Sequence, residues 1–221
     1  FLSSQLKIAE DGQAIYEFLQ NAADEDSTLF YLFYDDDYFV AVNNGNVFSE
    51  AGLKSLLNVA QSGKKDSTKI GRFGVGFKLV HRLVGKSDGM DELLEDYAGP
   101  ILFSWSKKDD LLALMRGDEV EDVCGDDKGL PYLMKLILTN FPAGVNESVK
   151  NLNYENQILF TKEEYEKMSL TVKKYLEQYV DSDNFDQGTL FFIKLGKEKR
   201  ALLDKDYEKN LKGGVEYALN T

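Results

Sequence analysis

The sequence is poor in the residues that build covalent and metal-centred sites. It contains one cysteine, Cys124, and one histidine, His81. A single cysteine excludes an internal disulfide and a cysteine-based zinc site. A single histidine excludes a Ser-His-Asp triad and a multi-histidine metal centre.

Long apolar runs and basic charge are also scarce. No apolar segment approaches the roughly 20 residues that a membrane-spanning helix needs, and no signal-peptide pattern opens the chain. These absences favour a cytoplasmic protein without a membrane partner. The formal net charge is −12, from 26 Lys and Arg against 38 Asp and Glu. A nucleic-acid interface needs a basic stripe, so we expect no nucleic-acid contact by this chain.

Apolar material is sufficient for one sizeable core. The chain has 221 residues, of which 43% are hydrophobic and 12% aromatic. This length and composition predict a single domain spanning residues 1–221. Because the first residue is Phe1 rather than methionine, we interpret the chain as a piece of a longer protein. We expect it to form the N-terminal part of that protein.

The hydrophobic pattern predicts helices and hairpins that interleave without a strict βαβ rhythm. Helical spacing of apolar residues predicts helices over residues 8–23, 49–60, 74–84, 163–179 and 199–210. Aromatic and β-branched runs predict strands over residues 29–34, 38–42, 101–106, 132–139 and 190–195. The apolar run over residues 111–116, which follows the polar residues 107–110, is predicted as a further strand. This order favours a two-layer α+β sandwich over a doubly wound parallel sheet.

A glycine-rich segment stands out at Ile70-Gly71-Arg72-Phe73-Gly74-Val75-Gly76-Phe77-Lys78. A polar run over residues 61–69 precedes it, and a helical apolar pattern follows it. Such a turn can hold phosphate oxygens, because its N–H groups point outward and the helix dipole favours negative charge. Lys64, just before the turn, could neutralise phosphate charge. The alternative is a tight turn that needs glycine for its backbone alone.

Three polar residues share one face of the first predicted helix. Glu17, Asn21 and Asp24 are spaced by four and three residues. The Asn21 side-chain oxygen is a suitable hard ligand for Mg²⁺, and Glu17 could accept a proton from an attacking water. The alternative is a solvated polar face with no chemical role.

Two short motifs lie at predicted strand ends. Asn43-Asn44-Gly45 ends the second strand, where a side chain could contact the edge of a nucleobase. An ordinary Asn-Gly turn is the alternative. Gly188-Thr189 opens the strand over residues 190–195, where a hydroxyl could reach a base or a buried polar group.

The order of these motifs resembles the ATP-binding domain of the GHKL family, which includes gyrase, heat-shock chaperones, histidine kinases and MutL. The resemblance extends from about Ala9 to Leu195. The glycine-rich segment is most similar to the heat-shock chaperone branch. The run Asn43-Asn44-Gly45-Asn46-Val47-Phe48 is similar to sacsin-type domains and their bacterial relatives. The family fold is an α/β sandwich, with helices covering one face of a mixed, mostly antiparallel sheet.

The resemblance implies ATP and Mg²⁺ as cofactors and assigns a role to each motif. Glu17 matches the general base, Asn21 the magnesium ligand and Asp24 an acidic residue that lines the nucleotide site. The base-binding positions are Asn43, in place of an aspartate that accepts from the adenine amino group, Gly45, which closes on the base, and Thr189, which bonds to the base through water. The matched lid residues are Ser62, Lys64, Gly71, Phe73, Gly74, Val75, Gly76 and Phe77.

Two departures from the family pattern bear on the base. Asn43 replaces the aspartate, and Val47 stands where many members have a second glycine. An amide accepts a hydrogen bond without charge assistance, which weakens it by about 1 kcal/mol. An amide can also donate, which an ionised carboxylate cannot. We therefore expect weaker discrimination in favour of adenine than in the aspartate-bearing relatives.

Two functional hypotheses follow from the resemblance. The first is a Mg²⁺-dependent ATPase whose glycine-rich lid closes over ATP and drives a conformational or dimerisation cycle, with a nucleotide-dependent homodimer as the possible assembly. The second is a nucleotide-sensing or degenerate interaction module with little hydrolysis. A histidine kinase is disfavoured, because that branch has asparagine where Glu17 stands. The sequence does not identify a client protein. Residues 61–69 are expected to be mobile without nucleotide.

Overall fold

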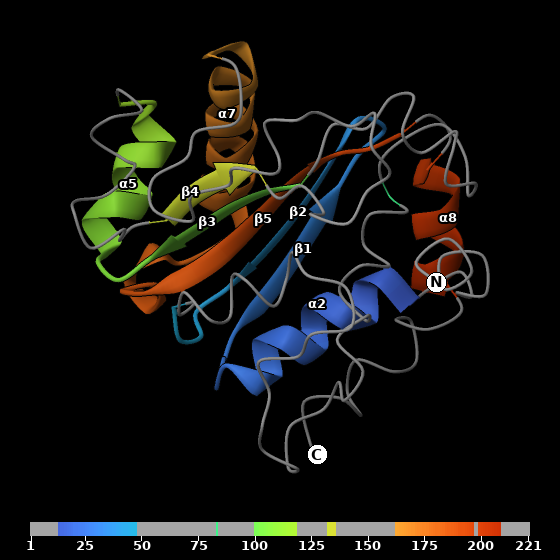
Figure 1. Cartoon of the computed structure of the whole chain (residues 1–221), viewed down its shortest axis with the longest axis horizontal. Coiled ribbons are helices and arrows are strands. Elements are labelled where there is room, and N and C mark those ends of the chain that lie inside the picture. The colour runs from blue at the N-terminus through green and yellow to red at the C-terminus, as the bar shows by residue number, and fades with distance from the viewer. Residues whose placement is uncertain are drawn as a thin grey trace, which may run out of the picture.

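The structure is a computed structural model that describes residues 13–47, 83, 100–118, 132–135, 162–196 and 199–208 (Figure 1). The described residues form a mixed α+β fold around a five-stranded sheet with strand order β1-β2-β5-β3-β4. Every neighbouring pair of strands is antiparallel. The strands are β1 (Phe30–Tyr34), β2 (Tyr38–Asn43), β3 (Ile101–Trp105), β4 (Tyr132–Lys135) and β5 (Gly188–Lys194).

The first two strands form the predicted hairpin. Phe30 pairs with Asn43 at its open end and Tyr34 with Phe39 near its turn. In the turn, Oδ1 of Asp35 accepts the backbone N–H groups of Asp37 at 2.9 Å and Tyr38 at 2.8 Å. A side-chain carboxylate that holds two N–H groups in this way fixes the turn locally.

One face of the sheet packs against α5 (Lys108–Arg116) and α7 (Lys162–Tyr179), which lie on the same side in Figure 1. Alternate residues of the central strands, including Val40, Phe103 and Phe192, form a buried cluster with apolar residues of these two helices. The helices are also joined by hydrogen bonds. Ser169 donates to the carbonyl of Leu114 at 2.7 Å.

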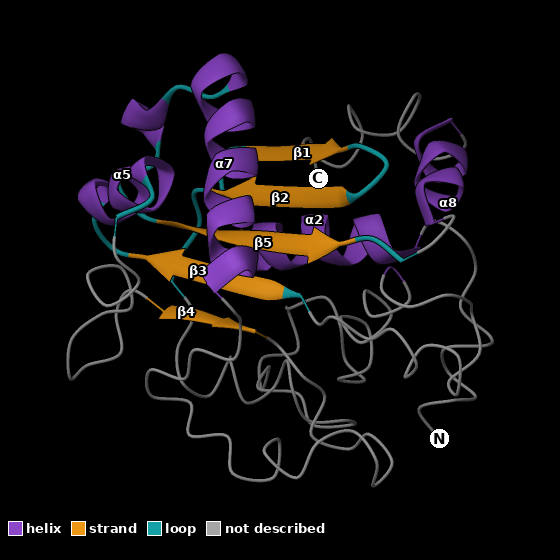
Figure 2. Ribbon diagram, turned by 90° about the horizontal axis from the view of Figure 1, so that it is seen from above, coloured by secondary structure: helices purple, strands orange, loops and turns teal. Residues whose placement is uncertain are grey.

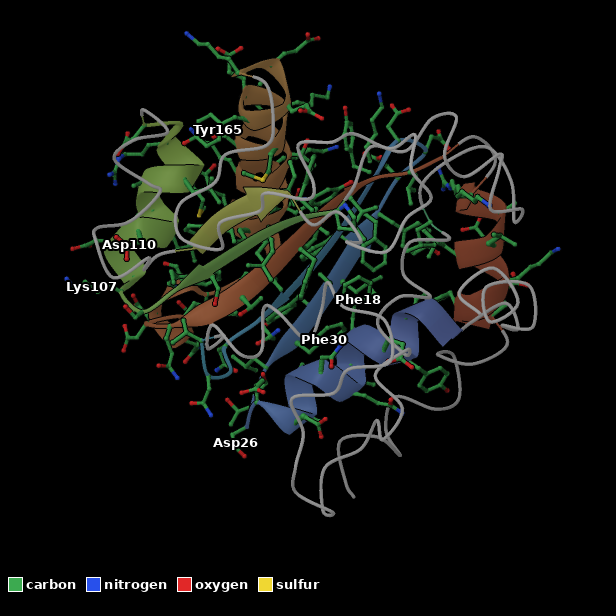
Figure 3. All side chains as sticks on the ribbon, in the orientation of Figure 1. Phe18, Asp26, Phe30, Lys107, Asp110 and Tyr165 are labelled. Carbon is green, nitrogen blue, oxygen red and sulfur yellow. The ribbon has the colours of Figure 1, made fainter. Side chains whose placement is uncertain are left out.

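The opposite face packs against α2 (Gln13–Asp24), as Figure 2 shows from a second direction. The ring of Phe18 on α2 lies 5.0 Å from that of Phe39 on β2 and 5.1 Å from that of Phe191 on β5. Ile15, Phe18 and Ala22 are buried, a spacing that places them on one stripe of the helix. Figure 3 shows Phe18 between α2 and the sheet.

These two helical layers correct one sequence-based expectation. The family resemblance implied helices on one face of the sheet, whereas the described residues place α2 on one face and α5 and α7 on the other. The reason is visible in the central strands. They are buried on both faces, because most residues at both their odd and their even positions are apolar.

A second correction concerns residues 111–116, which were predicted to form a strand. They belong to the helix α5. Asp109 and Asp110 lie in its first turn, where negative charge suits the helix dipole. Gly117 ends it in the left-handed conformation, with φ of 73°, and donates to the carbonyls of the last turn.

The remaining predicted elements agree with the structure where it describes them. The helix α7 and the strand β5 are confirmed, and α8 (Lys199–Asp206) falls within the predicted last helix. A short 3₁₀ helix, η3 (Ser182–Asn184), lies in the segment predicted as a loop. The helices predicted over residues 49–60 and 74–84 lie outside the described residues, apart from Leu83. Among the helices that the structure describes, none combines the length and the apolar character needed to cross a bilayer.

Candidate functional site

A row of polar side chains crosses the three central strands, β2, β5 and β3, on the face of the sheet that α2 covers. Asn43 on β2 pairs with Thr189 on β5, and Thr189 pairs with Ser104 on β3. Successive side chains of a strand point to opposite faces of the sheet. Asn43 is four residues from Phe39, and Thr189 is two from Phe191, so both side chains project from the face that Phe18 contacts. Ser104 is opposite Thr189 on the neighbouring strand and projects from the same face. All three are buried. Buried polar groups in an otherwise apolar sheet are costly unless they are hydrogen-bonded, so their partners define the site.

The Asn43 side chain is held by the end of α2. Its Oδ1 atom accepts the Ser27 hydroxyl at 3.0 Å and the backbone N–H of Gly45 at 3.0 Å. Among the described residues, its Nδ2 atom has no hydrogen-bond partner. The amide oxygen of Asn43 therefore already accepts two hydrogen bonds from the protein, whereas its amide nitrogen can still donate one to a ligand.

Asn44 has a structural role in the same turn. Its Oδ1 atom accepts the backbone N–H groups of Thr28 at 3.0 Å and Leu29 at 2.9 Å. Its Nδ2 atom donates to the Thr28 hydroxyl and to the carbonyl of Asn184. These bonds join the α2–β1 connection to the end of β2, and they place Asn43 beside the C-terminal end of α2.

Gly45 is required by the same close packing. A Cβ atom at this position would lie 2.3 Å from Oγ of Ser27 and 2.6 Å from the carbonyl oxygen of Glu25. Close packing alone thus explains why a glycine occupies position 45. Its predicted role of closing on a base stays a prediction.

Thr189 and Ser104 form a buried hydroxyl pair. Their oxygens are 2.9 Å apart, and Ser104 also donates to the carbonyl of Gly188 at 3.2 Å. Because a carbonyl can only accept, this second bond uses the single hydroxyl hydrogen of Ser104, and Thr189 donates to Ser104. The oxygen lone pairs of Thr189 then remain for a group on the α2 side.

The predicted acidic and amide residues lie on one flank of α2. On a helix of 3.6 residues per turn, Asn21 borders the stripe formed by Phe18 and Ala22, and Glu17 and Asp24 lie just beyond it. All three side chains are half-buried. The Nδ2 atom of Asn21 is buried without a hydrogen-bond partner. An orphaned amide of this kind costs about 1–3 kcal/mol, which a bound group that contacts it would offset.

The side-chain oxygen of Asn21 is of the type that Mg²⁺ takes as a ligand. Among the described residues, no group of three or more His, Cys, Asp or Glu side chains is arranged to hold a metal by itself. Mg²⁺ typically takes one or two protein oxygens and completes its octahedron with phosphate oxygens and water. The Asn21 oxygen could serve as that single protein ligand, with Glu17 one turn away on the same flank.

The predicted lid lies outside the described residues. This applies to Ser62, Lys64, Gly71, Phe73, Gly74, Val75, Gly76 and Phe77, and to the expected mobility of residues 61–69. The described part of the site therefore comprises α2, the turn over residues 43–46, and the row formed by Asn43, Thr189 and Ser104.

Sequence reasoning missed Ser27 and Ser104. Neither belongs to a recognisable motif, and each was identified only through its bond to a predicted residue. Ser27 follows the end of α2, where a polar residue is common. Ser104 could have been noticed as a hydroxyl within the apolar run Ile101–Trp105, since a polar residue inside a buried strand needs a partner.

A separate cavity of about 390 Å³ lies on the other face of the sheet, between β2, β3, β5 and α7. Tyr38, Ile101 and Phe192 line it together with Glu163, Glu164, Lys167 and Lys194. Burial raises the pKa of the Tyr38 hydroxyl above its usual value, and the nearby carboxylates of Asp37, Asp35 and Glu163 add to this rise. The Tyr38 hydroxyl is therefore neutral at physiological pH. Of the predicted site residues that the structure describes, none lines this cavity.

Comparison with known proteins adds no family assignment. No family model matches the chain, and no curated protein matches it.

Proposed function

We propose that the chain is a GHKL-type domain that binds and hydrolyses a nucleoside triphosphate with Mg²⁺, ATP being the nucleotide that the motif resemblance implies. One observation carries this proposal. The polar row lies on the face of the sheet that α2 covers, and the bond from Ser27 to Asn43, at 3.0 Å, ties the connection that follows α2 to this row. The motifs that supply these residues lie far apart in sequence, yet they contribute to one interface.

The proposed roles follow from the chemistry of each side chain. Asn21 would hold Mg²⁺ through its uncharged side-chain oxygen, and the ion would neutralise negative charge on the phosphates. Glu17 accepts a proton from the attacking water. Asn43 and Thr189 face the base. The glycine-rich segment over residues 70–78 wraps the phosphates and closes as a lid.

A Glu17→Gln variant tests the role of the base. The amide keeps the shape of the side chain but cannot accept a proton, so we expect nucleotide binding close to that of the unmodified protein. We expect phosphate release to fall at least a hundredfold, the usual contribution of a general base. Calorimetric titration with and without Mg²⁺ measures binding, and a phosphate-release assay measures turnover. Normal turnover by E17Q would remove Glu17 from the mechanism.

Glu177→Gln provides a matched control. Glu177 is exposed on α7, on the opposite face of the sheet, and its ion pair with Lys173 is long, at 3.9 Å, and lies at the surface. The same change of charge there is expected to leave binding and turnover unaffected. Absence of binding by every nucleoside triphosphate tested with Mg²⁺ would contradict the proposed function as a whole.

A nucleotide-sensing module with little hydrolysis is the second candidate. The Asn43 amide favours it, because Oδ1 already accepts two protein hydrogen bonds and cannot hold the adenine amino group as an aspartate would. This candidate predicts nucleotide binding without measurable phosphate release, and no difference between the E17Q variant and the unmodified protein.

A further inference from the structure

The orientation of the Asn43 amide is fixed by a backbone group. The N–H of Gly45 can only donate, and it lies 3.0 Å from the Asn43 amide atom that faces it, which must therefore be Oδ1. The Ser27 hydroxyl donates to the same atom at 3.0 Å. Turning the amide over would place its NH₂ group against the Gly45 N–H, leaving two donors facing each other in a buried site. This arrangement is costly, so the amide stays as it is.

The consequence is a reversal of polarity at the base-binding position. An aspartate that accepted the same two bonds through one oxygen would still present its second oxygen as an acceptor. Asn43 presents Nδ2 instead, and an NH₂ group only donates. The beginning of β5 continues this pattern. Thr189 gives its hydrogen to Ser104 and keeps only oxygen lone pairs for the α2 side. Since Asn43 and Thr189 are directly opposite each other, a donor and an acceptor lie side by side.

A 6-oxopurine has the complementary edge. Guanine and hypoxanthine present the acceptor O6 next to the donor N1–H, whereas adenine presents a donor amino group next to the acceptor N1. With adenine, the Asn43 NH₂ group would face another NH₂ group. With a 6-oxopurine, Nδ2 of Asn43 donates to O6, and Thr189 accepts from N1–H, either directly or through one water.

We propose that the base-binding end of this site selects a 6-oxopurine nucleotide over an adenine nucleotide. The inference rests on the proposed nucleotide-binding function and specifies the class of substrate. Asn43 is its specificity-determining residue, and Ser27 and Gly45 are positioning residues that act through the Asn43 amide.

The test compares ATP with inosine triphosphate on the full chain in the presence of Mg²⁺. These two nucleotides share the sugar and the phosphates and differ at position 6 and in the proton on N1. We expect inosine triphosphate to bind at least about tenfold more tightly, because a mismatched polar contact in a buried site leaves two groups unsatisfied. Guanosine triphosphate should resemble inosine triphosphate. Equal affinities, or tighter binding of ATP, would overturn the inference while leaving nucleotide binding in place.

An Asn43→Asp variant gives the second arm of the experiment. Its carboxylate can accept from Gly45 and Ser27 with one oxygen and from the adenine amino group with the other, so the preference should reverse in favour of ATP. Far-ultraviolet circular dichroism checks that N43D is folded. If N43D does not fold, the comparison on the unmodified protein still decides the inference. If neither protein binds any of the three nucleotides, the proposed function fails, and the inference fails with it.

Discussion

Ser27 and Asn43 lie 16 residues apart in the sequence, and the hydroxyl of Ser27 donates to Oδ1 of Asn43 at 3.0 Å. This bond joins the C-terminal end of α2 to the end of β2. Asn44 and Asn46 add further bonds between the same two segments. The helix that carries Glu17 and Asn21 is therefore held in register with the strand that carries Asn43.

Replacement of Gly45 by alanine tests this junction. The added Cβ atom would lie 2.3 Å from Oγ of Ser27 and 2.6 Å from the carbonyl oxygen of Glu25, so the connection must shift. We expect G45A to lower the free energy of unfolding by about 1–3 kcal/mol, the usual cost of overpacking. Denaturation with urea measures this change.

A double variant separates the two steric contacts. Adding Ser27→Ala to G45A removes the nearer obstacle but leaves the carbonyl of Glu25, which cannot move without the backbone. We expect the double variant to recover part of the lost stability and not all of it. Wild-type stability in G45A alone would show that the junction is looser than the structure indicates.

Asp35 gives the hairpin turn a dependence on pH. Burial alone would raise the pKa of Asp35, but hydrogen bonds from the backbone of Asp37 and Tyr38 and from the Tyr175 hydroxyl outweigh it and lower this pKa. A carboxylate with a lowered folded pKa contributes stability that is fully present above its unfolded pKa of about 3.9. That contribution is lost as the pH falls through the folded pKa.

Two variants isolate this effect. Asp35→Asn keeps an oxygen for the two N–H groups but does not titrate, so its unfolding free energy should fall less steeply below about pH 4 than that of the unmodified protein. Asp35→Ala removes the acceptor and should lose about 1–2 kcal/mol at pH 7. Denaturation curves from pH 7 to pH 3 measure both. Identical pH profiles for D35N and the unmodified protein would contradict the assigned role of Asp35.

Trp105 is the only tryptophan of the chain, and its side chain is fully buried. Its indole N–H donates to the carbonyl of Phe185 at 3.1 Å. We expect fluorescence emission typical of an apolar environment, little quenching by iodide, and a red shift on unfolding. Trp105→Phe should lower stability by about 1–3 kcal/mol, because the ring becomes smaller and the Phe185 carbonyl loses its donor. Strong iodide quenching in the folded protein would place Trp105 at the surface instead.

The sequence predicted most of the elements correctly because their signals are local. The aromatic runs on each side of Asp35 indicate a hairpin, and the apolar spacing along residues 163–179 indicates a helix. The strand prediction for Leu111–Arg116 was wrong, because a short apolar run is compatible with either a strand or a helix. Packing against α7 and the left-handed conformation of Gly117 favour the helix.

The residue types of the candidate site came from the sequence, but their arrangement did not. Local patterns singled out Glu17, Asn21, Asn43 and Thr189. Only the antiparallel register of β2 and β5 brings Asn43 opposite Thr189, across 146 positions of the sequence. Only tertiary contacts bring Ser27 and Gly45 to the Oδ1 atom of Asn43, where both donate hydrogen bonds. The Nδ2 atom of Asn43 is then the one that can donate to a ligand. The sequence thus indicated Glu17, Asn21, Asn43 and Thr189 but not Ser27 or Ser104. The tertiary structure decided which atoms of the candidate site form hydrogen bonds within the protein. The physical reason is that each position of the sequence specifies its own side chain, whereas the hydrogen bonds of that side chain depend on residues that are distant in the sequence.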